Sequence, residues 1–150
     1  MTLERTQDTD IRILKEEQCP SLSNVSTLTY QIGCNEEKKL LLRITHNTGN
    51  GKWNGGWVSV ADMQELIYEA QSPFSWKVLM PLTIGKSVNT PCFLLAALKN
   101  ERLIQPLDRQ YTSQPAADFQ DRMRALIDSS ISESKPRKRP KGRAGAAQTG

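Results

Sequence analysis

The stretch Ser26-Thr-Leu-Thr-Tyr-Gln-Ile-Gly33 decides the fold class of this 150-residue chain. Its apolar side chains alternate with polar ones, so Leu28, Tyr30 and Ile32 share one face of a strand. A polar turn follows, and residues 40–48 form a second apolar stretch that fits a strand. Together the two stretches predict a β-hairpin.

The residues after this hairpin extend it into a β-β-β-α order. Residues 57–60 predict a third short strand beyond a glycine-rich loop. Ser59 and Asp62 form a Ser-x-x-Asp capping pattern, which indicates that a helix begins there. Upstream of the hairpin, residues 9–14 alternate in polarity and predict an edge strand.

The second half of the chain predicts two more helices. Pro73 ends the first helix, and residues 76–84, which lie near two prolines, predict a strand or an extended loop. Thr90 and Pro91 predict the start of the next helix, because a capping hydroxyl is followed by proline. Residues 92–98 are apolar all round, which places this helix in the centre of the core.

The last elements complete the predicted fold. Residues 103–107 predict a strand or extended segment, and residues 115–131 predict an amphipathic helix. We therefore expect an α+β fold, a small antiparallel sheet with about three helices packed on it. The expected domain spans residues 9–132, between a disordered N-terminus (1–8) and a disordered basic tail (133–150).

Residues 135–143, here called the basic arm, hold six of the twenty Lys and Arg side chains and no acid. Without them, 14 Lys and Arg remain against 16 Asp and Glu, so the rest of the chain is slightly acidic. Prolines and glycines prevent a continuous helix and predict a flexible arm. Such an arm binds polyanions through their phosphates without reading a sequence, while docking, nuclear import and solubility are alternative roles. Its cations are Lys135, Arg137, Lys138, Arg139, Lys141 and Arg143.

The glycine-rich loop is the second unusual feature. Lys52, Trp53 and Trp57 could stack unpaired bases beside a phosphate contact. A simpler interpretation is that one tryptophan packs into the core, the glycines make the turn and the lysine is exposed. Only Arg43 adds a nearby positive charge, which favours the simpler interpretation. The Gly-Lys pair does not fit a phosphate-binding loop, because Trp53 stands where Ser or Thr is required.

The sequence offers little support for enzymatic chemistry. Cys19, Cys34, His46 and Cys92 are too widely spaced for a zinc site, so we expect no metal and no cofactor. His46 is the only histidine, and no serine elbow, paired-carboxylate motif or dinucleotide motif accompanies it. We expect no catalytic residues and a protein that is not an enzyme.

The cellular setting is predicted from hydropathy and cysteine usage. The longest apolar stretch, residues 92–98, is far shorter than the roughly 20 residues that span a bilayer. Three cysteines without clustered spacing suit a reducing compartment. We therefore expect a cytoplasmic protein that does not contact membranes.

Four segments give the chain a family resemblance: STLTYQIG, LLLRITHNTGNGKW, WVSVADMQELI and TPCFLLAALKNERLIQPL. Their pattern resembles small uncharacterised accessory proteins of bacterial plasmids and integrating conjugative elements, over roughly residues 25–107. Residues 40–67 are also similar in outline to whirly-type single-stranded-DNA-binding coactivators. These resemblances imply an accessory role on a mobile element, and they assign a function to no particular residue.

Two function hypotheses follow from the sequence. The first is a non-enzymatic accessory protein that binds DNA or RNA non-specifically and salt-sensitively through the basic arm. The second is a protein–protein adaptor in which the basic arm is only solubilising or regulatory. The adaptor would dock or dimerise through the apolar face of the C-terminal helix, which consists of Phe119, Met123, Leu126 and Ile127.

Overall fold

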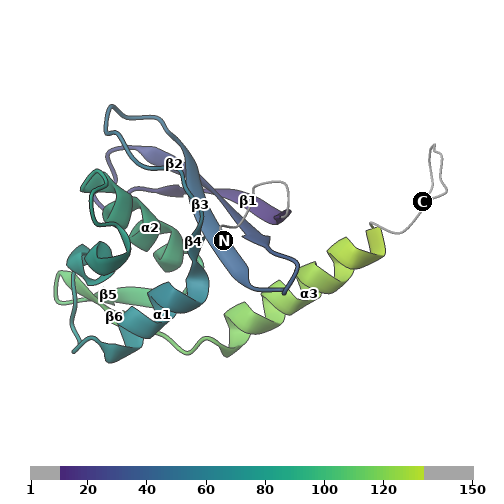
Figure 1. Cartoon of the computed structure of the whole chain (residues 1–150). Helices are drawn as coiled ribbons and strands as arrows, with labels where there is room; N and C mark the ends of the chain where they lie inside the picture. The colour runs from purple at the N-terminus through teal and green to yellow at the C-terminus, as the bar shows by residue number, and fades with distance from the viewer. Residues whose placement is uncertain (1–10, 134–150) are drawn as a thin grey trace.

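The computed structural model describes residues 11–133 and confirms an α+β fold (Figure 1). Four strands form one antiparallel sheet in chain order, and two more form a separate hairpin. The strands are β1 Arg12–Pro20, β2 Thr27–Cys34, β3 Leu40–Asn47, β4 Val58–Ser59, β5 Ile104–Leu107 and β6 Gln110–Ser113. The helices are α1 Val60–Glu69, the 3₁₀ helix η2 Trp76–Leu82, α2 Asn89–Asn100 and α3 Ala117–Glu133. The predicted N-terminal segment 1–8 and the basic arm lie outside the described residues.

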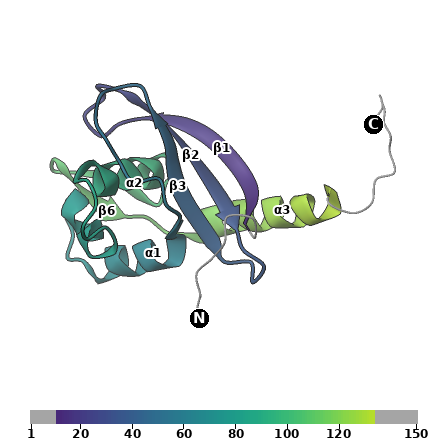
Figure 2. The same cartoon turned by 45° about the horizontal axis from the view of Figure 1, so that its top comes forward.

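The predicted hairpin forms the centre of the sheet. Tyr30 pairs with Ile44 and Ile32 pairs with Leu42 in the register of β2 and β3. Leu28, Tyr30 and Ile32 have no exposed surface, as their alternating pattern predicted. Their face of the sheet packs against α1, α2 and the β5–β6 hairpin, which lie on one side of it (Figure 2).

Helix α1 begins where the sequence predicted. The Ser59 hydroxyl accepts a hydrogen bond from the backbone N–H of Asp62 at 3.1 Å, so it satisfies one of the free donors of the first turn. Val60, Met63 and Ile67 are buried along one side of the helix. The short strand β4 passes directly into this helix.

Helix α2 is the central element of the core, as predicted. Within this helix, the six consecutive residues 93–98 are all buried. The predicted capping role of Thr90 is wrong, because the helix begins at Asn89 after Val88, and the hydroxyl that accepts from a backbone N–H of the first turn is that of Ser87, bonded to Asn89 at 3.2 Å. The Thr90 hydroxyl instead accepts a hydrogen bond from the backbone N–H of Asn54 at 3.0 Å, and so holds the glycine-rich loop against the helix.

The prediction of a strand or extended loop over residues 76–84 is also wrong. Residues 76–82 form η2, and the Ser75 hydroxyl accepts a hydrogen bond from the backbone N–H of Lys77 at 3.2 Å at its start. Leu79 is fully buried and fixes the helix to the core. Pro81 is tolerated because it stands near the end of a short helix, where its missing N–H removes little hydrogen bonding.

Two β elements differ from the sequence-based expectation. Strand β1 extends to Pro20 because it pairs with β2 over nearly the whole length of that strand. Strand β6 was not predicted. It is joined to β5 by Asp108 and Arg109, with φ angles of 51° and 68°, the two left-handed residues that a type I′ turn requires.

Helix α3 packs against β1 at its beginning and then leaves the body of the molecule (Figures 1 and 2). Phe119, Met123 and Ile127 are buried, which confirms the apolar face that the sequence predicted. The helix ends at Glu133, at its outer end. The described part of the chain therefore ends away from the sheet.

Candidate interaction sites

The two tryptophans of the glycine-rich loop lie on different faces of the sheet. The Trp53 indole N–H donates to the Ile44 carbonyl oxygen at 2.9 Å, and its ring lies 6.3 Å from that of Phe93 in α2. Trp57 lies on the opposite face, where the Arg43 guanidinium stacks on its ring at 4.4 Å from the centroid. Trp53 therefore packs against the core, and Arg43 covers one face of Trp57.

The glycine-rich loop is fixed to the start of α2 by hydrogen bonds that span a long stretch of sequence. The Lys52 carbonyl oxygen accepts from the Ser87 hydroxyl at 2.8 Å and from Asn89 Nδ2 at 3.0 Å. A side chain at Gly51 would place its Cβ 2.7 Å from Asn89 Nδ2, so a larger residue there would displace the Asn89 amide. The Lys52 residue itself is exposed.

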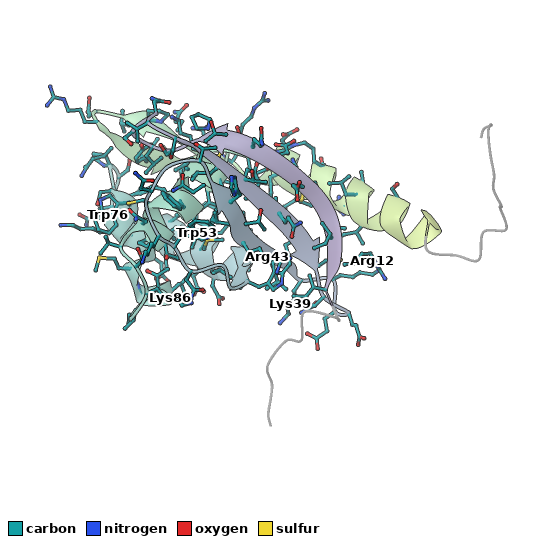
Figure 3. All side chains as sticks on the ribbon, turned by 90° about the horizontal axis from the view of Figure 1, so that it is seen from above. Arg12, Lys39, Arg43, Trp53, Trp76 and Lys86 are labelled. Atoms are coloured by element: carbon teal, nitrogen blue, oxygen red, sulfur yellow. The ribbon has the colours of Figure 1, made fainter. Side chains whose placement is uncertain are left out.

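An apolar groove opens next to this loop, between η2 and the start of α2. Its volume is about 470 Å³. Ile84 is 82%, Val88 67% and Met80 46% exposed, which is unusual for large apolar side chains that lie close together. This groove is lined by Trp76, Met80, Pro81, Thr83, Ile84, Gly85, Lys86, Ser87, Val88 and Pro91. Trp76 and Lys86 lie at the same end of the molecule as Trp53 (Figure 3).

Three exposed lysines on the segments that form or adjoin the groove have no ion-pair partner among the described residues. Lys52, Lys77 and Lys86 are exposed, and none of them forms an ion pair with any residue between 11 and 133. No Asp or Glu occurs in residues 70–100, which contain every residue that lines the groove, whereas α1, which packs against η2, carries Asp62, Glu65 and Glu69. The segment that lines the groove therefore carries cations and no acid, although the described residues as a whole are balanced in charge.

Sequence reasoning missed this groove, although a pattern for it was present. Trp76, Met80, Ile84 and Val88 recur at every fourth position, a spacing typical of one helical face. The intervening Pro81 and a glycine suggested an extended segment instead. The fold brings these side chains together because η2 and α2 flank a short turn.

A second cluster surrounds Glu101, which is 1% exposed at the end of α2. Its carboxylate accepts hydrogen bonds from the Tyr30 hydroxyl, from Lys15 Nζ at 2.9 Å and from Arg122 Nη1 at 2.9 Å. Asn100 Nδ2 donates to the Tyr30 hydroxyl oxygen at 2.8 Å. These residues come from β1, β2, α2 and α3, so the cluster joins the last helix to the sheet.

The protonation states in the Glu101 cluster follow from burial and pairing. Burial favours the neutral form of Glu101, but the hydrogen bonds from Tyr30, Arg122 and Lys15 outweigh it and lower the pKa of this carboxyl. Burial, together with the Glu101 carboxylate, raises the pKa of Tyr30 far above its usual value. Burial also raises the pKa of the nearby Cys19 thiol to about 11, which makes it a poor nucleophile.

The Glu101 cluster is a structural network in which each charged group already has a partner. A polar hollow of about 380 Å³ adjoins it. Among the described residues, the buried side-chain nitrogen and oxygen atoms without a hydrogen-bond partner are Trp57 Nε1 and Gln64 Nε2, and neither belongs to the cluster. Its acid is therefore held by cations and not left free to exchange protons.

The residues of the predicted adaptor face are largely used within the chain itself. Phe119 is 2%, Met123 1% and Ile127 8% exposed, and Leu126 is half-buried. Arg122, on the same helix, pairs with Glu101 and with Asp118. This face holds α3 to the sheet, so it is not open to a partner.

The other sequence-based candidates are dispersed. His46 is exposed near the end of β3, Cys19 and Cys34 are buried, and Cys92 is half-buried. Within residues 11–133, no three or more His, Cys, Asp or Glu side chains come close enough to hold a metal ion. In the same part of the chain, no helix is both long enough and apolar enough to cross a membrane. The six cations of the basic arm lie outside the described residues.

Comparison of the chain with protein-family models, with curated proteins and with solved structures finds no match.

Proposed function

We propose that this protein is a non-enzymatic accessory protein that binds nucleic acid non-specifically through its basic arm. The observation that supports this function most is the distribution of charge. Residues 11–133 contain 13 Lys and Arg against 13 Asp and Glu, whereas the basic arm holds six cations in nine residues without an acid. A polyanion is attracted to the arm far more strongly than to the balanced remainder.

The helices of the described residues support a non-specific mode of binding. A helix that reads base edges needs an exposed polar face at the major groove. Helix α2 is buried over residues 93–98. The exposed sides of α1 and α3 carry acids that phosphates repel, among them Asp62, Glu65, Asp121 and Asp128. Affinity in this proposal comes from phosphate contacts, which are blind to sequence.

The direction of α3, the last described helix before the arm in the sequence, favours this function. Helix α3 carries the chain away from the sheet and from the acidic side of α1 before the arm begins (Figure 1). The first arm cation, Lys135, is two residues beyond Glu133. The described part of the chain therefore ends away from the acids of α1, and the acids nearest the arm in sequence are Asp128 and Glu133 of α3.

The test is a binding measurement with a chain of full length in which the six arm cations are replaced by glutamine. Fluorescence anisotropy with two labelled 20-base-pair duplexes of unrelated sequence would give equal affinities for the parent protein and loss of binding for the six-glutamine variant. The matched control replaces Lys52, Lys77 and Lys86 by glutamine and keeps the arm. Retained binding in the six-glutamine variant, or a strong preference for one duplex, contradicts the proposal.

A further inference from the structure

The groove gathers exposed apolar side chains that the fold does not need to expose. Met80, Ile84 and Val88 are three of the seven large apolar side chains exposed within residues 11–133, and all three line this one groove. Isolated exposed apolar residues are ordinary, but a contiguous group beside a cavity is typical of a binding surface. The volume of about 470 Å³ falls within the usual range of ligand pockets.

The walls of the groove are fixed in place by interactions behind them. Leu79 is fully buried, and it anchors η2 from the side opposite Met80 and Ile84. Thr83, which is 5% exposed, donates its hydroxyl to the carbonyl oxygens of Leu79 and Met80 at 3.3 Å each. The backbone N–H of Lys86 donates to the Thr83 carbonyl oxygen at 3.0 Å. A wall held in this way requires little ordering when a ligand binds.

The two hydroxyl groups at the groove are already engaged, so the contacts that its walls offer are mainly apolar. The Ser87 hydroxyl donates to the Lys52 carbonyl oxygen, and the Thr83 hydroxyl is used within η2. No free side-chain amide or acid lines the groove to recognise the edge of a nucleic-acid base. This argues for apolar side chains of a protein as the occupant, in preference to a base.

The rim of the groove determines the charge of its partner. Lys86 belongs to the groove itself, Lys77 follows Trp76, and Lys52 is held next to Ser87 by its backbone. No acid occurs in residues 70–100, which supply the whole lining of the groove. In a partner whose apolar side chain enters the groove, neighbouring acidic residues would find three lysines that have no ion pair among the described residues.

We propose that this groove is the docking site for an acidic amphipathic segment of a partner protein. One or two bulky apolar side chains of the segment enter the groove between Met80, Ile84 and Val88. The flanking Asp or Glu residues of the segment pair with Lys52, Lys77 and Lys86. In this arrangement the domain recruits a protein partner through one end, while the basic arm is free for a polyanion.

The test uses a labelled 12-residue peptide in which Leu and Phe alternate with pairs of Asp and Glu. Because such a peptide also binds the basic arm, the measurement is made on the full-length chain with the six arm cations replaced by glutamine. Anisotropy is expected to show binding that weakens at high salt. Replacing all the acids of the peptide by lysine should abolish binding, since the rim is cationic.

Four single variants locate the contact. Ile84→Ser should weaken binding at least about tenfold, because it removes an aliphatic side chain from the contact. Lys86→Glu should weaken binding of the acidic peptide and permit binding of the lysine peptide. The matched controls are Val25→Ser, at a position 81% exposed, and Lys39→Glu, in an exposed turn region; both should bind like the parent.

Any of four results would overturn the proposal. The first is equal binding of the acidic and lysine peptides, and the second is equal binding by Ile84→Ser and Val25→Ser. The third is binding of a labelled oligo(dT) to the six-glutamine chain that is lost when Ile84→Ser is added, which would indicate that nucleic acid occupies the groove. A dimer in sedimentation analysis that Ile84→Ser dissociates indicates a second copy of the chain. These results do not depend on whether the basic arm binds nucleic acid.

Discussion

Replacement of Glu101 by glutamine tests the role assigned to the buried network. The substitution keeps the shape of the side chain but removes its charge from the contact with Lys15, Arg122 and Tyr30. Breaking a buried ion pair by neutralising one partner costs about 3–5 kcal/mol. Here the Lys15 and Arg122 side chains are 17% and 36% exposed, so water compensates in part. We expect a loss of about 2–3 kcal/mol in the free energy of unfolding.

The assay for this substitution is urea denaturation followed by tryptophan fluorescence. The midpoint should fall while the slope with urea concentration stays the same, because the area exposed on unfolding does not change. Glu37→Gln is the control, since Glu37 is 75% exposed in a loose pair with Lys39 at 3.9 Å, and it should change stability by less than about 0.5 kcal/mol. A Glu101→Gln protein as stable as Glu37→Gln would refute the structural role of the network.

The same prediction has a pH dependence with a defined sign. The pKa of Glu101 is lower in the folded protein than in the unfolded chain, where it is close to the ordinary value of about 4.3. Its stabilising contribution is therefore fully present above that value and is lost as the pH falls through the lower folded pKa. The difference in stability between the parent and Glu101→Gln should be constant near pH 7 and shrink in acid.

Two further predictions concern the same core and the first helix. Because the pKa of Tyr30 is higher in the folded protein, its hydroxyl ionises first in the unfolded chain, so its contribution to stability is full below about pH 10 and is lost as the pH rises further. Tyr30→Phe should therefore reduce the loss of thermal stability at alkaline pH. An unchanged pH profile in this variant would argue against a buried neutral hydroxyl at Tyr30. Ser59→Ala removes the hydroxyl that accepts from the Asp62 N–H and should lower the free energy of unfolding, measured by urea denaturation, by about 1 kcal/mol. Ser59→Asp is the control, because its side chain keeps an acceptor. An equal loss of stability in both variants would contradict the capping role of Ser59.

The sequence predicted the elements whose cause is local. The alternation around Tyr30 identified the buried face of β2, and the cap at Ser59 identified the first turn of α1. The continuous apolar run of residues 92–98 identified the central helix. In each case a short pattern contains the whole physical reason for the element.

The elements that were missed depend on contacts between distant residues or on unusual backbone geometry. Thr90 resembles a helix cap in sequence, but its partner Asn54 lies 36 residues earlier in the chain. The β5–β6 turn uses Asp108 and Arg109 at positive φ, where glycine or asparagine is the usual indication of a type I′ turn. Neither feature is visible in a local window.

The candidate sites show the same division. The basic arm is visible in the sequence because six cations in nine residues need no fold to be recognised. Recognising the groove required the folded structure, since only there do Met80, Ile84 and Val88 line one cavity and does the Lys52 carbonyl oxygen accept hydrogen bonds from Ser87 and Asn89. Likewise, the use of Phe119 and Met123 in the core became clear only when α3 was seen against β1.

The most direct test of the central claim is the salt dependence of nucleic-acid binding. The logarithm of the association constant for a 20-base-pair duplex is measured between 50 and 200 mM salt, for the parent and for the six-glutamine variant. If all six arm cations contact phosphates, the slope for the parent is about −5, a loss of about a thousandfold over this range. The six-glutamine variant should bind weakly, with a slope near zero. Equal slopes for the two proteins would contradict the claim that the basic arm binds nucleic acid.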